Sequence, residues 1–389
     1  MKPRQVRDRV QWVGAVDWNR RLFDALIPLP DGTSYNAYLV KGSERTALID
    51  TVDPAMENVL AGHLSAVDRI DYVVSHHTEQ DHSGSIPFVL NKYKDAVVLC
   101  TKKAKDLLTD HLDIQPDRIR TVEDGETVWL GDRTLRFVHT PWVHWPETMV
   151  TYLPEDRILF SCDFLGSHLA TSELYAGNDP QVMEAAKRYY AEIMMPFRPS
   201  VRKNLAKVRE LGFDIVAPSH GPIYDHPENI LSAYADWSSD RVSNEVVMVY
   251  VSMHGSTEAM ANHLLAALVD RGVKVHKFEL TTTDLGKLAM ALVDAATIVV
   301  GTPILNGGAH PVALAAAHLV GVLRPKLRYG AVIGSYGWST KGIEQIAEVV
   351  AGLKLETLGT VLCKGRPRQD TFSALDNLAG TILDKHMSL

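Results

Sequence analysis

The chain has 389 residues, of which 46% are hydrophobic and 22% charged, the balance of an ordinary soluble globular protein long enough for two or three domains. Its formal net charge of −7 argues against nucleic acid or an anionic membrane as partner, because both favour basic patches. No apolar run reaches the length of about 20 residues that a helix needs to cross a bilayer. The first residues lack the apolar core of a secretory signal. The three widely spaced cysteines predict a protein with reduced thiols in the cytoplasm.

Short β-like runs dominate the first part of the chain. They are separated by turns and a few helical stretches and lie at residues 35–40, 46–50, 72–75, 96–100, 157–161 and 213–219. The polar segment 238–244 interrupts this pattern, and a regular alternation of strand and helix follows it. We therefore expect two domains, residues 1–243 and residues 244–389.

The segment 77–82, HTEQDH, crowds four metal-ligand side chains behind an apolar run: His77, Glu79, Asp81 and His82. Unpaired carboxylates this close repel each other and are costly to bury, so we expect a cation between them. In an extended loop, the first three of these side chains would share one side and His82 would turn toward another position. That spacing can serve two metal ions. Ser83 and Ser85 are expected to cap a following helix that has Pro87 near its start.

Three further candidate ligands each follow a later apolar run: His144, Asp163 and His220. Four imidazoles and three carboxylates are too many for one tetrahedral zinc, but with one bridging carboxylate they make two four-coordinate sets. Such mixed ligation suits non-haem iron or manganese and tolerates zinc. A lone histidine is usually structural or solvated, and four are interpreted so: His63, His111, His139 and His168. His76, beside His77, stays ambiguous.

The motifs HTEQDHSGSIP, HWPE, SCDF and PSHGPIY, in this order, resemble the metal-binding signature of the flavodiiron proteins, a branch of the metallo-β-lactamase fold. The resemblance implies that the first domain is an αββα sandwich. Glu79 stands where the hydrolases of this fold carry histidine, and a carboxylate there implies iron. By the family pattern one iron is bound by His77, Glu79 and His144, and the other by Asp81, His82 and His220. Asp163 would bridge the two.

The second part of the chain alternates strands with amphipathic helices. Strands are predicted at 246–251, 274–280, 297–303, 329–335 and 356–363, and helices at 258–272, 284–295, 310–323, 342–353 and 372–386. This repeated pattern predicts an α/β domain with a doubly wound parallel sheet.

Three loops at strand ends of this sheet are expected to bind FMN. The first is rich in Ser and Thr and opens a helix, which makes an anion site suited to a phosphate monoester. It lacks both the Walker sequence and the dinucleotide glycine spacing. The clustered acids of a phospho-receiver domain are missing, and the loops resemble those of flavodoxins, although His254-Gly255 replaces a bulkier aromatic pair of many flavodiiron proteins. The predicted cofactor-binding residues are Ser252, Met253, His254, Gly255, Ser256, Thr257, Thr302, Pro303, Ile304, Leu305, Asn306, Gly307, Gly308, Ser335, Tyr336, Gly337, Trp338 and Ser339.

The resemblance implies a flavodiiron oxidoreductase that reduces dioxygen to water and/or nitric oxide to nitrous oxide at a di-iron centre fed by FMN. No CxxC pair is present, so a rubredoxin-like protein or a reduced deazaflavin coenzyme must supply electrons from outside. The family pattern also implies a head-to-tail homodimer, alone or as a dimer of dimers, in which each flavin faces the partner's irons. Two alternatives stay open: a zinc-dependent hydrolase with a regulatory flavodoxin-like domain, and an electron carrier with a vestigial metal site.

Overall fold

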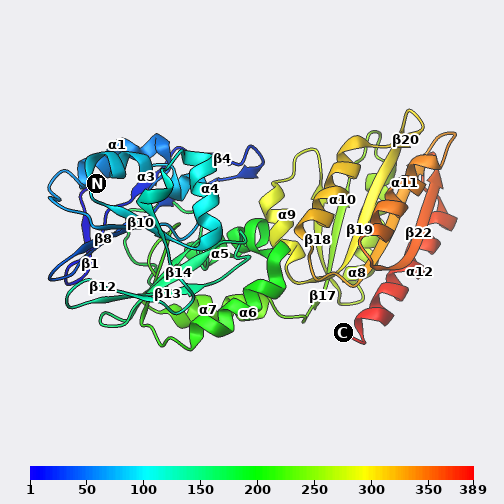
Figure 1. Cartoon of the computed structure of the whole chain (residues 1–389). Coiled ribbons are helices and arrows are strands. Elements are labelled where there is room, and N and C mark those ends of the chain that lie inside the picture. Colours follow the sequence, from blue (N-terminus) through cyan, green and yellow to red (C-terminus); the bar gives the residue numbers. More distant parts are fainter. The chain divides into compact units, whose positions relative to one another are not determined.

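The computed structural model describes the backbone of residues 1–389 and every side chain except that of residue 351 (Figure 1). The chain divides into two compact units, Met1–Ser238 (unit 1) and Ser239–Leu389 (unit 2). Among the described residues, no helix combines the length and the apolar character needed to cross a bilayer.

Unit 1 is built on two packed sheets. The first has the strand order β1 (Arg4–Arg7), β2 (Val10–Trp12), β7 (Tyr38–Lys41), β8 (Thr46–Ile49), β9 (Tyr72–Val74), β10 (Val97–Cys100) and β11 (Ile119–Thr121). The second has the order β12 (Thr127–Trp129), β13 (Thr134–His139), β14 (Met149–Leu153), β15 (Ile158–Cys162) and β16 (Ile215–Pro218). Two small pairs complete the strands: β3 (Ala15–Asp17) with β6 (Thr33–Tyr35), and β4 (Leu22–Phe23) with β5 (Ile27–Pro28).

Alternation of side chains along the strands produces two cores on the two faces of the first sheet. Val40 and Ile49 point inward and pack with Phe137 and Phe160 of the second sheet. Their neighbours in sequence, such as Leu48, point outward and pack with a layer of helices. That layer is formed by α1 (Glu57–His63), α3 (Ile86–Lys92) and α4 (Lys102–Leu112).

Helices of the second half of unit 1 lie along the opposite side of the sandwich (Figure 1). They are α5 (Pro180–Tyr189), the π-helical and 3-10 segments η3 (Tyr190–Met194) and η4 (Met195–Phe197), α6 (Arg198–Arg209) and α7 (Pro227–Trp237). Helix α6 is fastened to the end of β13, because Lys207 Nζ donates to the carbonyl oxygen of His139 at 2.8 Å. Three short helices remain: η1 (Pro54–Met56), α2 (Gln80–Ser83) and η2 (Pro116–Arg118). The expected αββα sandwich is confirmed.

Unit 2 contains a parallel sheet with the order β18 (Lys274–Glu279), β17 (Ser243–Tyr250), β19 (Ala295–Leu305), β21 (Tyr329–Tyr336) and β22 (Glu356–Lys364). The short strand β20 (Gly308–Ala309) pairs antiparallel with the end of β19. Helices α8 (Ser256–Val269) and α12 (Gln369–His386) share a core with one face of the sheet. The other helices are α9 (Leu285–Leu292), α10 (Pro311–Leu323) and α11 (Lys341–Gly352).

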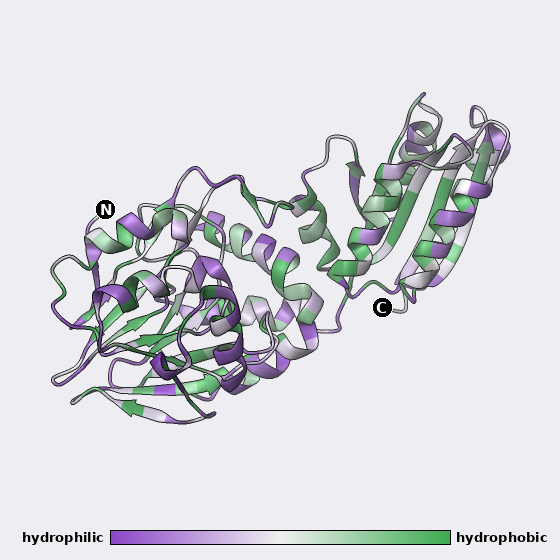
Figure 2. Cartoon of the chain, turned by 45° about the horizontal axis from the view of Figure 1, so that its top comes forward, coloured by the Kyte–Doolittle hydropathy of each residue, from purple (hydrophilic) through white to green (hydrophobic). Residues whose placement is uncertain are grey.

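The strand order of unit 2, with the first strand between the second and the third, is that of a doubly wound flavodoxin-like sheet. Both faces of its central strands are buried: Val246 and Met248 contact the α8–α12 core, and Val247 and Val249 on the other face are equally inaccessible to solvent. Figure 2 shows green, hydrophobic stretches within the strands of this sheet. The predicted doubly wound sheet is confirmed.

Candidate metal centre

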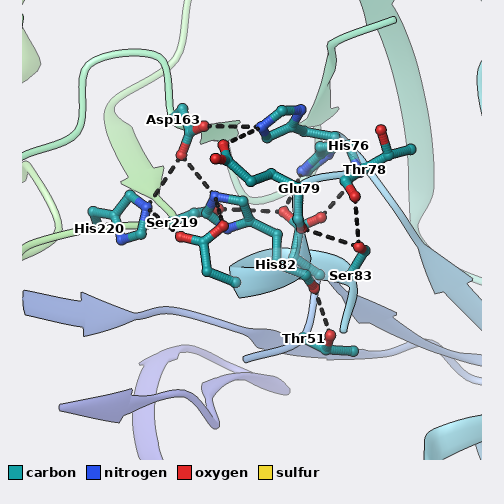
Figure 3. Close-up of polar contacts among 12 residues, drawn as sticks. Thr51, His76, Thr78, Glu79, His82, Ser83, Asp163, Ser219 and His220 are labelled. Carbon is teal, nitrogen blue, oxygen red and sulfur yellow. Dashed lines mark hydrogen bonds and ion pairs between the residues drawn. The ribbon is translucent and has the colours of Figure 1, made fainter. Parts of the chain in front are cut away.

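The seven candidate ligands gather at one edge of the two sheets of unit 1. The segment after β9 provides His77 and Glu79, and helix α2 then provides Asp81 and His82. The β13–β14 connection and the ends of β15 and β16 provide the remaining three, His144, Asp163 and His220. Figure 3 shows Asp163 and His220 turned toward His82, although these side chains come from different strands and from α2.

The helical turn of α2 corrects two expectations. The segment is not extended, so His77, Glu79 and Asp81 do not share one side; the turn instead places Asp81 with His82. Ser83 and Ser85 also do not cap α3 with their side chains. Their hydroxyls donate to backbone carbonyls at Thr78 (2.8 Å) and Val52 (2.9 Å) respectively, and so fix the ligand loop from behind.

The first ligand set consists of His77, Glu79 and His144 with one oxygen of Asp163. Nε2 of His77 lies 3.0 Å from Oε2 of Glu79 and 3.4 Å from Oδ2 of Asp163. Nε2 of His144 lies 3.2 Å from each of the same two oxygens. Ligand atoms about 2.1 Å from one ion and 90–110° apart are about 3.0–3.4 Å from each other, so these spacings fit a shared metal.

The second ligand set consists of Asp81, His82 and His220 with the other oxygen of Asp163. Oδ1 of Asp163 lies 2.9 Å from Nε2 of His82 and 3.3 Å from Nε2 of His220. Asp81 approaches the same two nitrogens at 3.3 and 3.2 Å. Asp163 therefore presents Oδ2 to the first set and Oδ1 to the second, which is the geometry of a bridging carboxylate.

Buried oxygens in this cluster are left without hydrogen-bond donors. Both carboxylate oxygens of Asp81 and both of Asp163 are inaccessible to solvent and accept no hydrogen bond. Lone pairs that are buried in this way are costly unless a cation or a donor lies between them. The donor set thus fits two metal ions that prefer mixed nitrogen and oxygen ligands.

The pKa shifts within the cluster also favour bound cations. Burial alone would raise the pKa of Asp163, but the charge of His82 and contacts with His144 and His220 hold it well below its usual range. Burial likewise opposes charge on His220, but Asp163 and Asp81 raise its pKa to about 10. Asp163 and its surroundings therefore favour positive charge in this cluster, which bound metal ions would supply.

His76 is not a ligand, because both of its ring nitrogens are already engaged. Nδ1 lies 2.7 Å from Oδ2 of Asp50, and Nε2 lies 2.7 Å from Oγ1 of Thr151. Asp50 also accepts from the His76 backbone N–H at 2.9 Å and from Oγ of Ser219 at 3.3 Å. This buried aspartate thus holds residues that immediately precede the ligands His77 and His220. Sequence reasoning did not identify Asp50, although it ends an apolar run, TALID.

Of the four histidines interpreted as structural, His111 is exposed, and the other three fall into two groups. His63 and His139 contact backbone carbonyls, with Nδ1 of His63 2.9 Å from Val13 O and Nε2 of His139 3.1 Å from Val122 O. His168 instead lies beside the metal centre: its ring centroid is 4.8 Å from that of His220, and burial lowers its pKa well below the usual range. A lone histidine in the sequence carries no signal for this position.

Aromatic rings form the walls around the cluster. Trp145 lies edge-on to His77 with centroids 4.9 Å apart, and Phe197 lies 6.4 Å from His144. On the side of the second set, Phe23 and Tyr189 lie 6.5 and 5.9 Å from His220. Such walls limit bulk water around a reactive centre.

The predicted flavin residues occupy three neighbouring segments at the carboxyl edge of the sheet in unit 2. In the first, Oγ of Ser252 accepts from the backbone N–H of Gly255 at 3.1 Å, and Gly255 has φ +83° at the start of α8. Thr257 and Ser335 join the first and third segments through their hydroxyls, 2.9 Å apart. The side chain of Trp338 is 80% exposed, so it does not belong to the core and is free to cover a flat ring.

The second segment differs from the expected loop. Strand β19 continues through Leu305, so Thr302–Leu305 are extended, and a tight turn at Asn306 (φ +52°) and Gly307 (φ +85°) leads into β20. Positive φ at both turn positions matches the hairpin turns that favour Asn-Gly. The residues predicted to contact the flavin are therefore held by strand pairing and not by a free loop.

Two family models match the chain: the ODP family beta lactamase over residues 33–221 and flavodoxin over residues 248–375. The nitric oxide reductase of Moorella thermoacetica is 37% identical over 369 residues, which is 92% of each chain. The solved structure of rubredoxin oxygen:oxidoreductase from Desulfovibrio gigas superposes with a TM-score of 0.95 at 29% identity and covers 99% of both chains. The flavodiiron protein from Giardia intestinalis gives a TM-score of 0.92 at 28% identity and covers 100% of this chain and 97% of that chain.

Proposed function

The chain belongs to the flavodiiron protein family, and we propose on that basis that it is an oxidoreductase that reduces dioxygen to water, nitric oxide to nitrous oxide, or both. The observation that carries the proposal is the position of Asp163, whose two oxygens face two complete sets of ligands. A paired metal centre offers two neighbouring positions at which a diatomic gas can be bound and oriented for reduction.

The proposed cofactors are two iron ions in unit 1 and FMN in unit 2. The first iron would be held by His77, Glu79 and His144, the second by Asp81, His82 and His220, with Asp163 shared. When bound, two irons and one FMN together supply four electrons and the open coordination positions for the gas. Dioxygen consumes four electrons and four protons to give two waters, whereas two molecules of nitric oxide consume two electrons and two protons to give nitrous oxide and one water.

The side chains of the protein would hold the metal ions in place and limit the access of water to the metal centre. The ligand histidines around Asp163 favour its ionised form, as its lowered pKa indicates. Hydrogen bonds to Glu147 and to the carbonyl oxygen of Ser34 fix the rings of His77 and His220 at their outward nitrogens. The aromatic side chains around the cluster are proposed to keep larger molecules away from the metal centre and to admit only small ones.

Metal analysis and a visible spectrum of the purified protein test this function against its alternatives. Two irons and one flavin per chain, with consumption of dioxygen or nitric oxide, are the expected result. Zinc without flavin and hydrolysis without gas consumption would support the zinc hydrolase. Flavin without metal would support the electron carrier. Assays that compare rubredoxin with reduced deazaflavin coenzyme identify the electron donor.

The proposed assembly is a head-to-tail homodimer, alone or paired into a dimer of dimers, in which each flavin faces the partner's irons. Each unit carries exposed apolar side chains near its proposed site, which supports contact with another surface. In unit 1, Leu26 is 56% and Trp142 47% exposed; in unit 2, Met253 is 39% and Trp338 80% exposed. A two-fold pair would create two equivalent sites.

Complementation between two inactive variants tests this assembly. One variant lacks metal ligands (His82→Ala with His144→Ala), and the other is altered at the proposed flavin site (Ser256→Ala with Trp338→Ala). Mixed dimers should regain gas reduction at one of their two sites. Inactivity of mixed dimers whose formation is demonstrated would show that electrons do not cross between subunits.

The proposed location is the cytoplasm. Cys100, Cys162 and Cys363 are all buried thiols without disulfide partners, which suits a reducing compartment. Fractionation of the source cells, with activity followed in each fraction, is the direct test.

A further inference from the structure

Glu147 is a buried carboxylate directly behind one of the metal ligands. It lies in the β13–β14 connection and is 2% exposed. Its Oε1 lies 3.1 Å from Nδ1 of His77 and accepts from the backbone N–H of Thr78 at 3.1 Å and from the Thr78 hydroxyl at 2.7 Å. Thr101 Oγ1 donates to the backbone carbonyl of Glu147 at 2.9 Å. The carboxylate is therefore held firmly at the outward side of the His77 ring.

The outward nitrogens of two other ligand histidines form no hydrogen bond with a carboxylate. Nδ1 of His220 lies 2.7 Å from the carbonyl oxygen of Ser34, which is a neutral acceptor. Nδ1 of His82 is buried and has no hydrogen-bond partner. A carboxylate behind a ligand imidazole makes that imidazole a stronger electron donor than a carbonyl does. The environment of His77 thus differs in kind from that of the second ligand set.

Counting charges makes the difference between the two positions explicit. Each position has one carboxylate of its own, Glu79 or Asp81, and each shares Asp163. Only the first has a further carboxylate, Glu147, in direct contact with the ring of a ligand. The buried Asp50 also interacts with His82, but its direct contact is with His76, which is not a ligand. Three donors converge on Oε1 of Glu147, namely Nδ1 of His77 and the backbone N–H and hydroxyl of Thr78, and such donors favour the ionised form of a carboxylate.

Positive charges near Glu147 do not cancel this effect. Lys102 and Lys103 line, together with Glu147, a cavity of about 560 Å³ that reaches the surface. Both lysine residues are exposed, and water and salt screen exposed charges far more strongly than buried ones. His139 lines the same cavity, and its Nε2 is engaged with the carbonyl oxygen of Val122 at 3.1 Å.

We propose that Glu147 is a positioning residue that makes the two metal positions unequal, by orienting His77 and by lowering the reduction potential of the ion at His77, Glu79 and His144. The inference rests on the proposed function, since it requires iron at both positions. A nearby negative charge stabilises the more highly charged ferric ion, so the first position would be reduced after the second. The form with one ferric and one ferrous ion would then persist over a broad range of applied potential.

The test is a redox titration of the iron-loaded, FMN-containing protein, followed by electron paramagnetic resonance of the half-reduced iron pair. In Glu147→Gln, which keeps the shape but removes the charge, the stability constant of the half-reduced pair should fall about three- to tenfold. Glu123→Gln is the matched control, because Glu123 is exposed on the wall of the same cavity and should leave the constant unchanged. The FMN potential in each sample serves as an internal reference.

Two further variants keep the carboxylate charge while changing how it is held. In Glu147→Asp and Thr78→Val, the stability constant of the half-reduced iron pair should stay close to that of the unmodified protein. A fall of this constant in either variant would overturn the electrostatic account. This test remains decisive even if Glu147→Gln does not retain both irons. An unchanged constant in iron-loaded Glu147→Gln would overturn it as well. Absence of a half-reduced signal in the unmodified protein would instead count against the proposed function.

Discussion

Replacing Asp50 tests whether the layer behind the ligands holds the metal centre together. Asp50 is 2% exposed and accepts three hydrogen bonds, from the His76 backbone N–H (2.9 Å), from His76 Nδ1 (2.7 Å) and, weakly, from Ser219 Oγ (3.3 Å). Burial opposes its ionisation, but the charge and hydrogen bonds of His76 lower its pKa below the ordinary value. Asp50→Ala would therefore leave two buried donors on His76 and one on Ser219 without a hydrogen-bond acceptor.

The magnitude follows from these contacts. Hydrogen bonds to a charged group contribute about 1.5–3 kcal/mol each, and removing one partner of a buried ionic pair costs about 3–5 kcal/mol in total. We expect Asp50→Ala to lower the free energy of unfolding of unit 1 by about 3–5 kcal/mol. Asp50→Asn should cost only about 1–2 kcal/mol. In that variant His76 can shift its proton to Nε2, donate to Thr151, and accept at Nδ1 from the new amide.

Urea unfolding of the metal-free protein, followed by tryptophan fluorescence, measures this loss. Every tryptophan except Trp338 lies in unit 1, so the signal reports mainly on that unit. The exposed Asp68 provides a control, Asp68→Ala, which should change the free energy of unfolding by less than about 0.5 kcal/mol. Metal affinity of Asp50→Ala should also fall about 10–100-fold. A loss below about 1 kcal/mol, or a larger loss in Asp50→Asn than in Asp50→Ala, would refute the reasoning.

The remaining predictions concern the bridge, the flavin and the protons of the metal-free centre. Asp163→Asn should lower metal content and abolish gas reduction while FMN stays bound, and full activity would exclude Asp163 as the bridge. Trp338→Ala should shift the flavin potential or weaken FMN retention; an unchanged spectrum, potential and occupancy would mean that this exposed ring does not contact the flavin. Because Asp163 and Asp81 raise the pKa of His220 to about 10, His220 is charged at pH 8 and must lose its proton to bind metal. Adding ferrous iron to metal-free protein at pH 8 should therefore release more protons than the same addition to His220→Ala, as a pH-stat would record; equal release would contradict the raised pKa.

The five long strands and five helices of unit 2 were predictable from the sequence to within about three residues at each end. The predicted helices at 310–323 and 342–353 correspond to Pro311–Leu323 and Lys341–Gly352, and the strand at 356–363 to Glu356–Lys364. Apolar periodicity and turn residues are local properties, so they are readable without knowing the fold. The ligand residues were readable for a similar reason, since four are crowded into segment 77–82 and the others directly follow apolar runs.

The way in which these residues combine into a site could not be predicted from the sequence, because it depends on tertiary contacts. The helical turn of α2 separates Asp81 from His77, and the two oxygens of Asp163 divide between the ligand sets, because segments more than 60 residues apart meet at one sheet edge. The residues that hold the ligands in place also could not be identified from the sequence. Asp50 meets His76 across 26 positions of sequence, and Glu147 meets His77 across 70. A carboxylate in a sequence does not disclose its partner, because pairing depends on strand register and burial, which the packed sheets alone establish.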